Sequence, residues 1–208
     1  MQTEVNKITT DYLIDISKVN VPLNLGEIFS NDKKVSLEIG FGEGEFLTDM
    51  AHKHPSQNFL GLEIKRYRFL KAIRNAMNFN LDNIKFIHID AGLALRQIFR
   101  YRSFDNIYIN FPDPWPKSRH NKHRIFNQEL LHYIYNVLSP NGNIYIASDH
   151  EDYIVNIMET IKNTAGLRLS SVLKRTPDSA LTKGMLTRFE KEFIDEGKNI
   201  YYLNYIKG

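Results

Sequence analysis

Short apolar runs that suit β-strands alternate with longer amphipathic segments from residue 35 onward. Strand-like runs rich in β-branched and aromatic residues occur at 35–39, 58–63, 84–89, 106–110 and 144–148. Segments with apolar residues at helical spacing occur at 46–53, 65–80, 92–99, 126–137 and 154–161. Strands that alternate with helices form βαβ units, so the pattern predicts a mostly parallel sheet with helices on both faces.

The alternation ends after Gly166. Two further strand-like runs, 167–173 and 200–206, are separated by a polar stretch, 176–197, without an obvious packed helix. Two late strands joined in this way favour an antiparallel C-terminal hairpin at one edge of the sheet. We therefore predict a Rossmann-like α/β fold with a seven-stranded sheet. Residues 1–34 are expected to form an N-terminal arm or helix packed on a single domain that spans 35–208.

The size and composition exclude several classes of protein. A chain of 208 residues supports one α/β domain, and no apolar run approaches the roughly 20 residues that a membrane helix needs. The absence of cysteine excludes disulfides, thiolate metal sites and a cysteine nucleophile, and it fits a cytoplasmic protein. The seven histidines lack carboxylates at ligand spacing, so no metal site is predicted. No obligate protein partner is evident, and we expect a monomer or a homodimer.

A glycine-rich turn follows the first predicted strand, and ligands of open α/β sheets bind outside such strand ends. Gly40, Gly42 and Gly44 let the backbone turn tightly and approach a ligand closely. Glu63, at the end of the second strand, can accept hydrogen bonds from both hydroxyls of a ribose. Together these residues predict a cofactor site.

Two cofactors suit this architecture, NAD(P) and S-adenosylmethionine. The spacing GxGxG lacks the later glycine of a dinucleotide-binding turn, and the carboxylates of Glu38, Glu43 and Glu45 would repel a pyrophosphate. A sulfonium with an α-amino group favours nearby carboxylates, and Glu38 is well placed for the ammonium. Asp90 and Ala91, after the third strand, are placed to hold the adenine amino group. We therefore predict S-adenosylmethionine.

The segment 110–124 combines a stiff backbone with charged side chains. Three prolines within five residues fix an extended path around Asp113. Trp115, the single tryptophan, can stack on a base or pack against the protein. The basic residues that follow can grip phosphates; they are Lys117, Arg119, Lys122 and Arg124. An earlier basic run is most simply a solvated helix face, since the net charge is only +3; it comprises Lys65, Arg66, Arg68, Lys71 and Arg74.

The run FPDPWPKSRHNKHR at 111–124 resembles the signature of the bacterial tRNA (guanine-N7-)-methyltransferase family, FPDPWPK-x-RH-x-K-R. Further stretches agree in order: LEIGFGEG at 37–44, GLE at 61–63 with Arg68, SD at 148–149 and TRFE at 187–190. The resemblance covers roughly residues 35–206 and departs at His123, where arginine is common. It implies a class I methyltransferase fold that uses S-adenosylmethionine, with tRNA as partner and the guanosine at position 46 of the variable loop as target.

The resemblance also implies roles for single residues. Cofactor-binding positions are implied at Glu38, Glu63, Asp90 and Asp113, and Asp113 is also implied as the catalytic residue. Substrate-binding positions are implied at Lys117, Asp149, Thr187, Arg188, Phe189 and Glu190.

The chemistry of the implied target limits what the site must do. N7 of guanine bears no proton and has an in-plane lone pair, so methylation depends mainly on alignment. We expect Asp113 to position the base by accepting from its N1 and N2 protons, and to steady the growing positive charge. Two alternatives stay open. A methyltransferase acting on another nucleic acid or a small molecule would not need the basic run. A non-catalytic tRNA-binding module would not need the acidic pocket.

Overall fold

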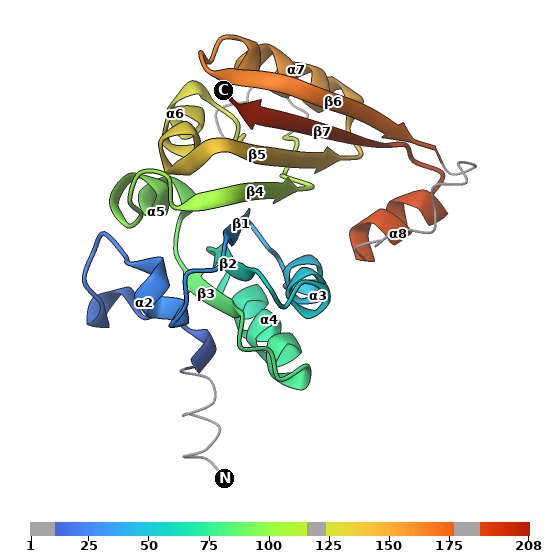
Figure 1. Ribbon diagram of the computed structural model, residues 1–208. Helices are drawn as coiled ribbons and strands as arrows, with labels where there is room; N and C mark the ends of the chain where they lie inside the picture. The colour runs from blue at the N-terminus through green and yellow to red at the C-terminus, as the bar shows by residue number, and fades with distance from the viewer. Residues whose placement is uncertain (1–10, 116–123, 177–187) are drawn as a thin grey trace.

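A computed structural model describes residues 11–115, 124–176 and 188–208, and the side chains of Arg188 and Phe189 are not described. Within these ranges, seven strands form one sheet in the order β3-β2-β1-β4-β5-β7-β6 (Figure 1). The strands are β1 (Val35–Ile39), β2 (Asn58–Glu63), β3 (Ile84–His88), β4 (Phe104–Asn110), β5 (Leu138–Ser148), β6 (Leu167–Arg175) and β7 (Ile200–Lys207). β7 runs antiparallel to β5 and β6, and the other neighbours are parallel. The predicted α/β sheet with an antiparallel C-terminal hairpin is confirmed.

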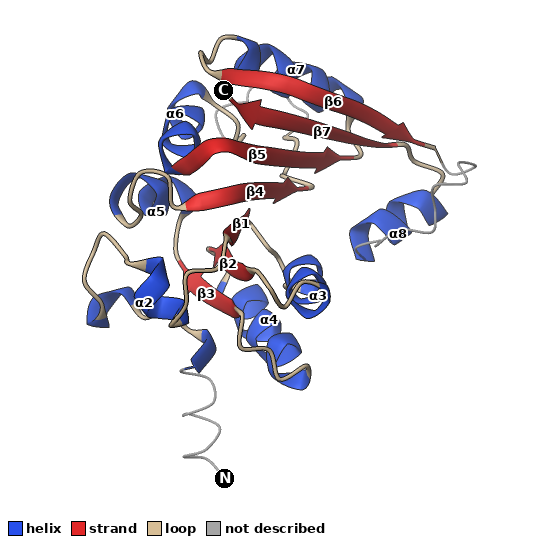
Figure 2. Cartoon of the chain, in the orientation of Figure 1, coloured by secondary structure: helices blue, strands red, loops and turns tan. Residues whose placement is uncertain are grey.

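Helices cover both faces of the sheet (Figure 2). They are η1 (Ile16–Lys18), α2 (Leu25–Phe29), α3 (Glu45–Lys53), α4 (Arg66–Asn78), α5 (Ala91–Gln97), α6 (Gln128–Val137), α7 (Glu151–Lys162) and α8 (Arg188–Asp195). One apolar core joins the sheet to α2, α5, α6 and α7. A smaller core joins the opposite face, around Phe59 and Phe86, to α3 and α4.

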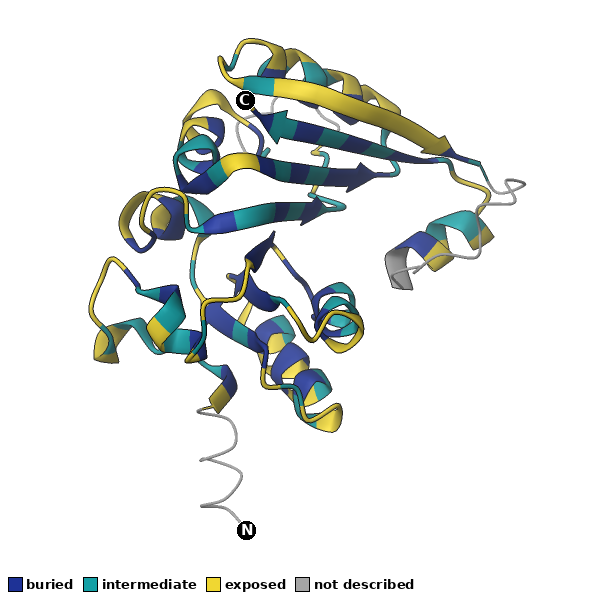
Figure 3. Ribbon diagram, viewed as in Figure 1, coloured by how far each residue is buried: buried dark blue, intermediate teal, exposed yellow. Residues whose placement is uncertain are grey.

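Burial explains why the central strands form where the sequence predicts them. All residues of β1 and β2 are buried, because both faces of these parallel strands are covered (Figure 3). The edge strand β6 is exposed along most of its length. Leu37 of β1 pairs with Leu60 of β2 and Ile107 of β4, so apolar side chains of neighbouring strands lie in register.

Two sequence-based expectations are wrong in detail. The strand predicted at 144–148 begins earlier, because β5 starts at Leu138 and continues through Asn141 and Gly142. Asn141 has a φ of 60°, and the pairing of β4 with β5 shifts register near this point. The polar stretch 176–197, where no packed helix was expected, contains α8.

The N-terminal residues that the structure describes pack on the sheet. The Ile14 amide donates to the Phe86 carbonyl at 2.9 Å, and Leu13 forms a parallel bridge with the same residue. Leu23, Leu25 and Phe29 are buried in the larger core. These contacts hold the described part of the N-terminal segment against the sheet. Across the described parts of the chain, none of the helices has the length and apolar character needed to cross a membrane.

Candidate functional site

Two adjoining cavities lie at the carboxyl ends of β1, β2 and β4. Their volumes are about 450 and 380 Å³. The larger one is lined by Glu63, Asp90 and Trp115, and the smaller one by Glu38, Gly42 and Asp149. Residues lining both are Gly40, Arg68, Asn110, Phe111, Pro112 and Asp113. The topology thus gathers most of the predicted site residues that the structure describes.

Glu38 is buried at the end of β1, with 2% of its surface exposed. Its Oε1 accepts a hydrogen bond from Asn110 Nδ2 at 2.9 Å, whereas its Oε2 has no hydrogen-bond partner among the residues that the structure describes. Burial raises the pKa of this carboxyl to about 8, opposed by the Asn110 hydrogen bond and reinforced by the negative charge of Glu63. An unpartnered buried carboxylate oxygen is costly unless a ligand completes it, and an ammonium group would do so.

The glycines of the turn have two roles: two of them leave space for a ligand, and the third packs against a helix. Gly40 and Gly42 have φ values of 73° and 59°, and a Cβ at either would meet open space. Because both line a cavity, they leave room for a ligand close to the backbone. Gly44 instead faces α4, where a Cβ would lie 2.5 Å from Ala72 Cβ. Glu63 holds the turn by accepting from the amides of Gly42 at 3.0 Å and Lys65 at 2.8 Å.

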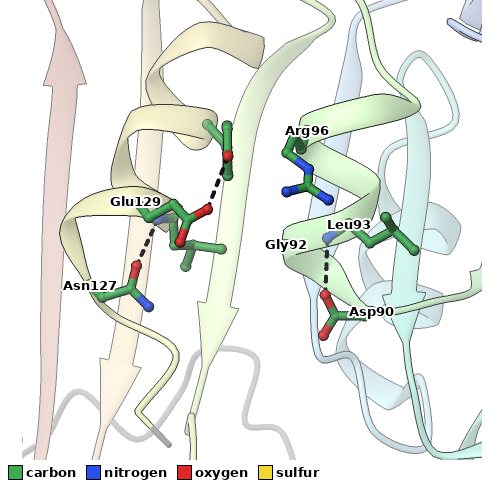
Figure 4. A pocket seen from close by; sticks show the side chains of 8 residues that line it. Asp90, Gly92, Leu93, Arg96, Asn127 and Glu129 are labelled. Carbon is green, nitrogen blue, oxygen red and sulfur yellow. Dashed lines mark hydrogen bonds between the residues drawn. The ribbon is translucent and has the colours of Figure 1, made fainter. Parts of the chain in front are cut away.

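Asp90 is the N-cap of α5, and its Oδ1 accepts from the Leu93 amide at 2.9 Å. It also lines a cleft of about 280 Å³ between α5 and α6, toward which Arg96 and Glu129 point from the two helices (Figure 4). This cleft continues from the larger cavity, since Asp90 lines both. Ala91 begins α5 and packs against the core, and it is not among the lining residues of either cavity.

The loop after β4 carries Asp113, which is exposed on the wall shared by the two larger cavities. Phe111 and Trp115 have φ values of 49° and 41°, in the left-handed region that non-glycine residues rarely adopt. Trp115 is 37% exposed and lines the larger cavity, so stacking on a ligand and packing both stay open to it.

Arg124 is half-buried, and its guanidinium bonds groups of the protein. Its Nε donates to the Pro114 carbonyl at 2.8 Å, and its two terminal nitrogens lie 3.2 Å from Asn156 Oδ1 and 3.5 Å from the Trp115 carbonyl. The contact of Arg124 with phosphate stays a prediction.

A third cavity, of about 210 Å³, adjoins the site on the face of the sheet near α8. Aromatic side chains line it, and Tyr108 and Tyr145 stack with ring centroids 5.0 Å apart. Glu190 of α8 is buried there and accepts a hydrogen bond from the Tyr202 hydroxyl. Asn110 lines this cavity as well as the other two, so all three meet at the end of β4.

Asp149 does not cap the helix that follows it. His150 is the N-cap of α7, and the Asp149 carboxylate lies 3.5 Å from Lys198 Nζ. Asp149 lines the smaller cavity, where a substrate-binding role was implied for it.

Several predicted residues lie outside the described part of the chain. They are Lys117, Arg119, Lys122 and Thr187, together with the side chains of Arg188 and Phe189. Among the residues that are described, no group of three or more His, Cys, Asp or Glu side chains could hold a metal ion.

The structure brings two residues into the site to which no site role was assigned from the sequence, Asn110 of the segment 110–124 and Arg68 of the motif around Glu63. Asn110 bonds Glu38 although the two lie 72 positions apart in the chain. Arg68 lines both larger cavities, and its Nε donates to the Tyr67 hydroxyl at 2.9 Å. A role of Asn110 in the site could have been predicted from its position at a strand end, directly before the proline-rich loop.

Comparison with known proteins agrees with this geometry. Residues 32–203 match the Methyltransf_4 family, described as "Putative methyltransferase". A tRNA (guanine-N(7)-)-methyltransferase of Buchnera aphidicola is 39% identical over 197 residues, which span 93% of this chain and 79% of that protein. One of the same name from Thermotoga maritima is 33% identical over 182 residues, and the chain spans only 56% of its length.

The fold is similar to that of a solved antibiotic-related methyltransferase, with a TM-score of 0.65 and 16% identity over 89% of this chain and 96% of that one. The sheet is therefore that of class I methyltransferases, whose cofactor, S-adenosylmethionine, fits the glycine turn and the unpartnered oxygen of Glu38. By its sequence match over most of its length, the chain belongs to the tRNA (guanine-N(7)-)-methyltransferase family.

Proposed function

We propose that this protein transfers a methyl group from S-adenosylmethionine to N7 of a guanine in tRNA, at position 46 of the variable loop, in the cytoplasm. The position of Asp113 carries the proposal. Asp113 lines both cavities, of which the smaller contains the buried carboxyl of Glu38 and the larger reaches Asp90. A base beside Asp113 would therefore face a cofactor bound across the two cavities. The names of the Buchnera and Thermotoga relatives support the choice of atom and substrate.

Different residues would bind different parts of the cofactor. S-adenosylmethionine supplies, when bound, a methyl group activated by a sulfonium. Glu38 would hold the ammonium through its unpartnered oxygen, and Glu63 would accept from the ribose hydroxyls. Asp90 would accept from the adenine amino group through the oxygen that does not cap α5. These contacts hold the donor in one orientation.

Alignment of the base is the main task left to the protein. N7 has a lone pair and no proton, so no side chain has to remove one before attack. We propose that Asp113 accepts from the N1 and N2 protons of the guanine and stabilises the positive charge that grows on the ring. Asp149 and Glu190 would hold the same base from the sides of the smaller and aromatic cavities.

The exposed face of α4 supports an RNA partner. This helix and its N-cap contain Lys65, Arg66, Arg68, Lys71 and Arg74 and no acidic residue. Cations in a first helical turn oppose the helix dipole, so Lys65 and Arg66 bring no advantage to the helix itself. Tyr67 is 64% exposed beside them and lines the smaller cavity. A phosphate backbone leading to the target base would match this surface in charge.

The function is tested directly with unmodified tRNA transcript and S-adenosylmethionine labelled in the methyl group. We expect label in the RNA and, after borohydride and aniline treatment, a single cut in the variable loop. Label without that cut would mean another target atom or another methyltransferase activity. Tight tRNA binding without label would support the non-catalytic binding module.

Asp113→Asn is expected to lower kcat by about 10²- to 10³-fold, the effect of losing one preorganised electrostatic contact. The Kd values for tRNA and for S-adenosylmethionine should stay within about threefold, since other residues hold both. Single-turnover kinetics and binding titrations measure these quantities, with the exposed Asp82→Asn as control. A kcat close to that of the wild type would refute the catalytic role.

Glu38→Gln is expected to weaken S-adenosylmethionine binding by roughly 10- to 100-fold, the value of a charge-assisted hydrogen bond. Because the pKa of Glu38 is raised to about 8, the free protein carries it mainly neutral at pH 7, and binding of a cation expels the proton. Wild-type affinity should therefore rise as pH increases from 6 to 8, and that of the variant should not. Calorimetry in buffers of different ionisation enthalpy measures the released proton, and equal release by both proteins would contradict the assignment.

Combined Arg66→Gln and Arg74→Gln substitutions test the α4 surface. Two lost phosphate contacts should make the dependence of log affinity for tRNA on log salt concentration shallower by roughly 1.4 to 1.8. The exposed Lys162 and Arg168, on α7 and β6, provide the matched double variant, for which the wild-type slope is expected. If both variants keep that slope, α4 is only a solvated helix face.

A further inference from the structure

We propose that Arg124 is a positioning residue that holds the loop carrying Asp113 in its working conformation, by bonding two carbonyls of that loop to α7. The inference rests on the proposed function in one respect: Asp113 is taken to act on the bound base. Nothing in it depends on contact between Arg124 and RNA.

The contacts of Arg124 join the loop to the helix layer. Its Nε and one terminal nitrogen bond the carbonyls of Pro114 and Trp115, and the other terminal nitrogen bonds Asn156 of α7. Its guanidinium carbon lies 4.9 Å from the ring centroid of Tyr153, a fully buried residue of the same helix. Each nitrogen therefore has a protein partner, and the planar group rests on a rigid surface.

The loop needs such support because its backbone is strained. Phe111 and Trp115 both have left-handed φ values, which persist in non-glycine residues only where the surroundings enforce them. Pro112 and Pro114, between them, lack the N–H groups with which a loop usually secures itself. At one end the Phe111 amide donates to the Ala147 carbonyl at 2.8 Å. At the other end, the carbonyls of Pro114 and Trp115 are bonded by Arg124.

Asp113 lies between these two attachments, next to Pro114. Release of the second attachment would let the strained backbone relax and shift the Asp113 carboxylate relative to the shared wall of the cavities. A misplacement of about 1 Å at a reacting centre is enough for a loss of order 10²-fold. A lysine cannot replace the arginine, since one ammonium cannot reach three acceptors in a plane.

The experiment compares Arg124→Lys with the wild type and with Arg100→Lys, an exposed control. Trp115 is the single tryptophan, so its fluorescence reports on the loop in the intact protein. We expect Arg124→Lys to shift the emission to longer wavelength and to increase acrylamide quenching. Label transfer to tRNA transcript should show kcat lowered by about 10- to 100-fold. The Kd for S-adenosylmethionine and the salt dependence of tRNA binding should stay as in the wild type.

A second variant keeps the test decisive if Arg124→Lys folds poorly by circular dichroism. Asn156→Ala removes one partner of the guanidinium and should change fluorescence and kcat in the same direction but less. Arg124→Gln removes the charge, and unchanged fluorescence together with a salt slope shallower by roughly one in that variant would make Arg124 a phosphate contact and overturn the proposal. A lower melting temperature with unchanged fluorescence and kcat would reduce the residue to a structural role. The fluorescence readout needs no methyl transfer, so it remains informative even if the proposed reaction is wrong.

Discussion

The hydrogen bond between Asn110 and Glu38 is the contact around which the site is organised. It joins the ends of β4 and β1, and it gives a buried carboxyl one partner while leaving the other oxygen without one. Burial of a carboxylate is expensive, so this arrangement favours a cationic ligand group at that point. The glycine turn begins two residues after Glu38, and the proline-rich loop begins directly after Asn110. Both ligand-facing segments therefore start from this one contact.

The C-terminal hairpin completes the site from the other side. Because β7 returns antiparallel beside β5, the segment before it brings α8 to the carboxyl ends of the parallel strands. Phe193 of α8 then lies with its ring centroid 5.3 Å from that of Phe111, and Glu190 reaches the aromatic cavity. The proposed cofactor pocket thus comes from the first half of the sheet, and the proposed base pocket comes largely from its second half.

Sequence patterns predicted the strands and most helices within a few residues, because buried parallel strands and amphipathic helices have distinct periods. The errors have local causes. Asn141 and Gly142 favour a left-handed backbone and suggest a turn, but pairing with β4 carries β5 through them as an irregularity. Helix α8 is short and lies in a mostly polar stretch, so it was not predicted, although Phe189 and Phe193 stand four positions apart at helical spacing. Asn110 and Arg68 lie in segments with a recognised pattern, but no role in the site was predicted for either.

The sequence by itself determined the order of the elements and the chemistry at the strand ends: the glycine turn, the acidic residues and the proline-bound Asp113. These features are local, since each depends on the identity of a residue and of its neighbours in the chain. Only the tertiary structure decided that Glu38 keeps one oxygen unpartnered, that Gly44 faces Ala72, and that Arg124 turns inward to the loop. These contacts depend on residues that the order of strands in the sheet brings together. A run of basic residues has the same sequence pattern whether its side chains face solvent or bond carbonyl groups.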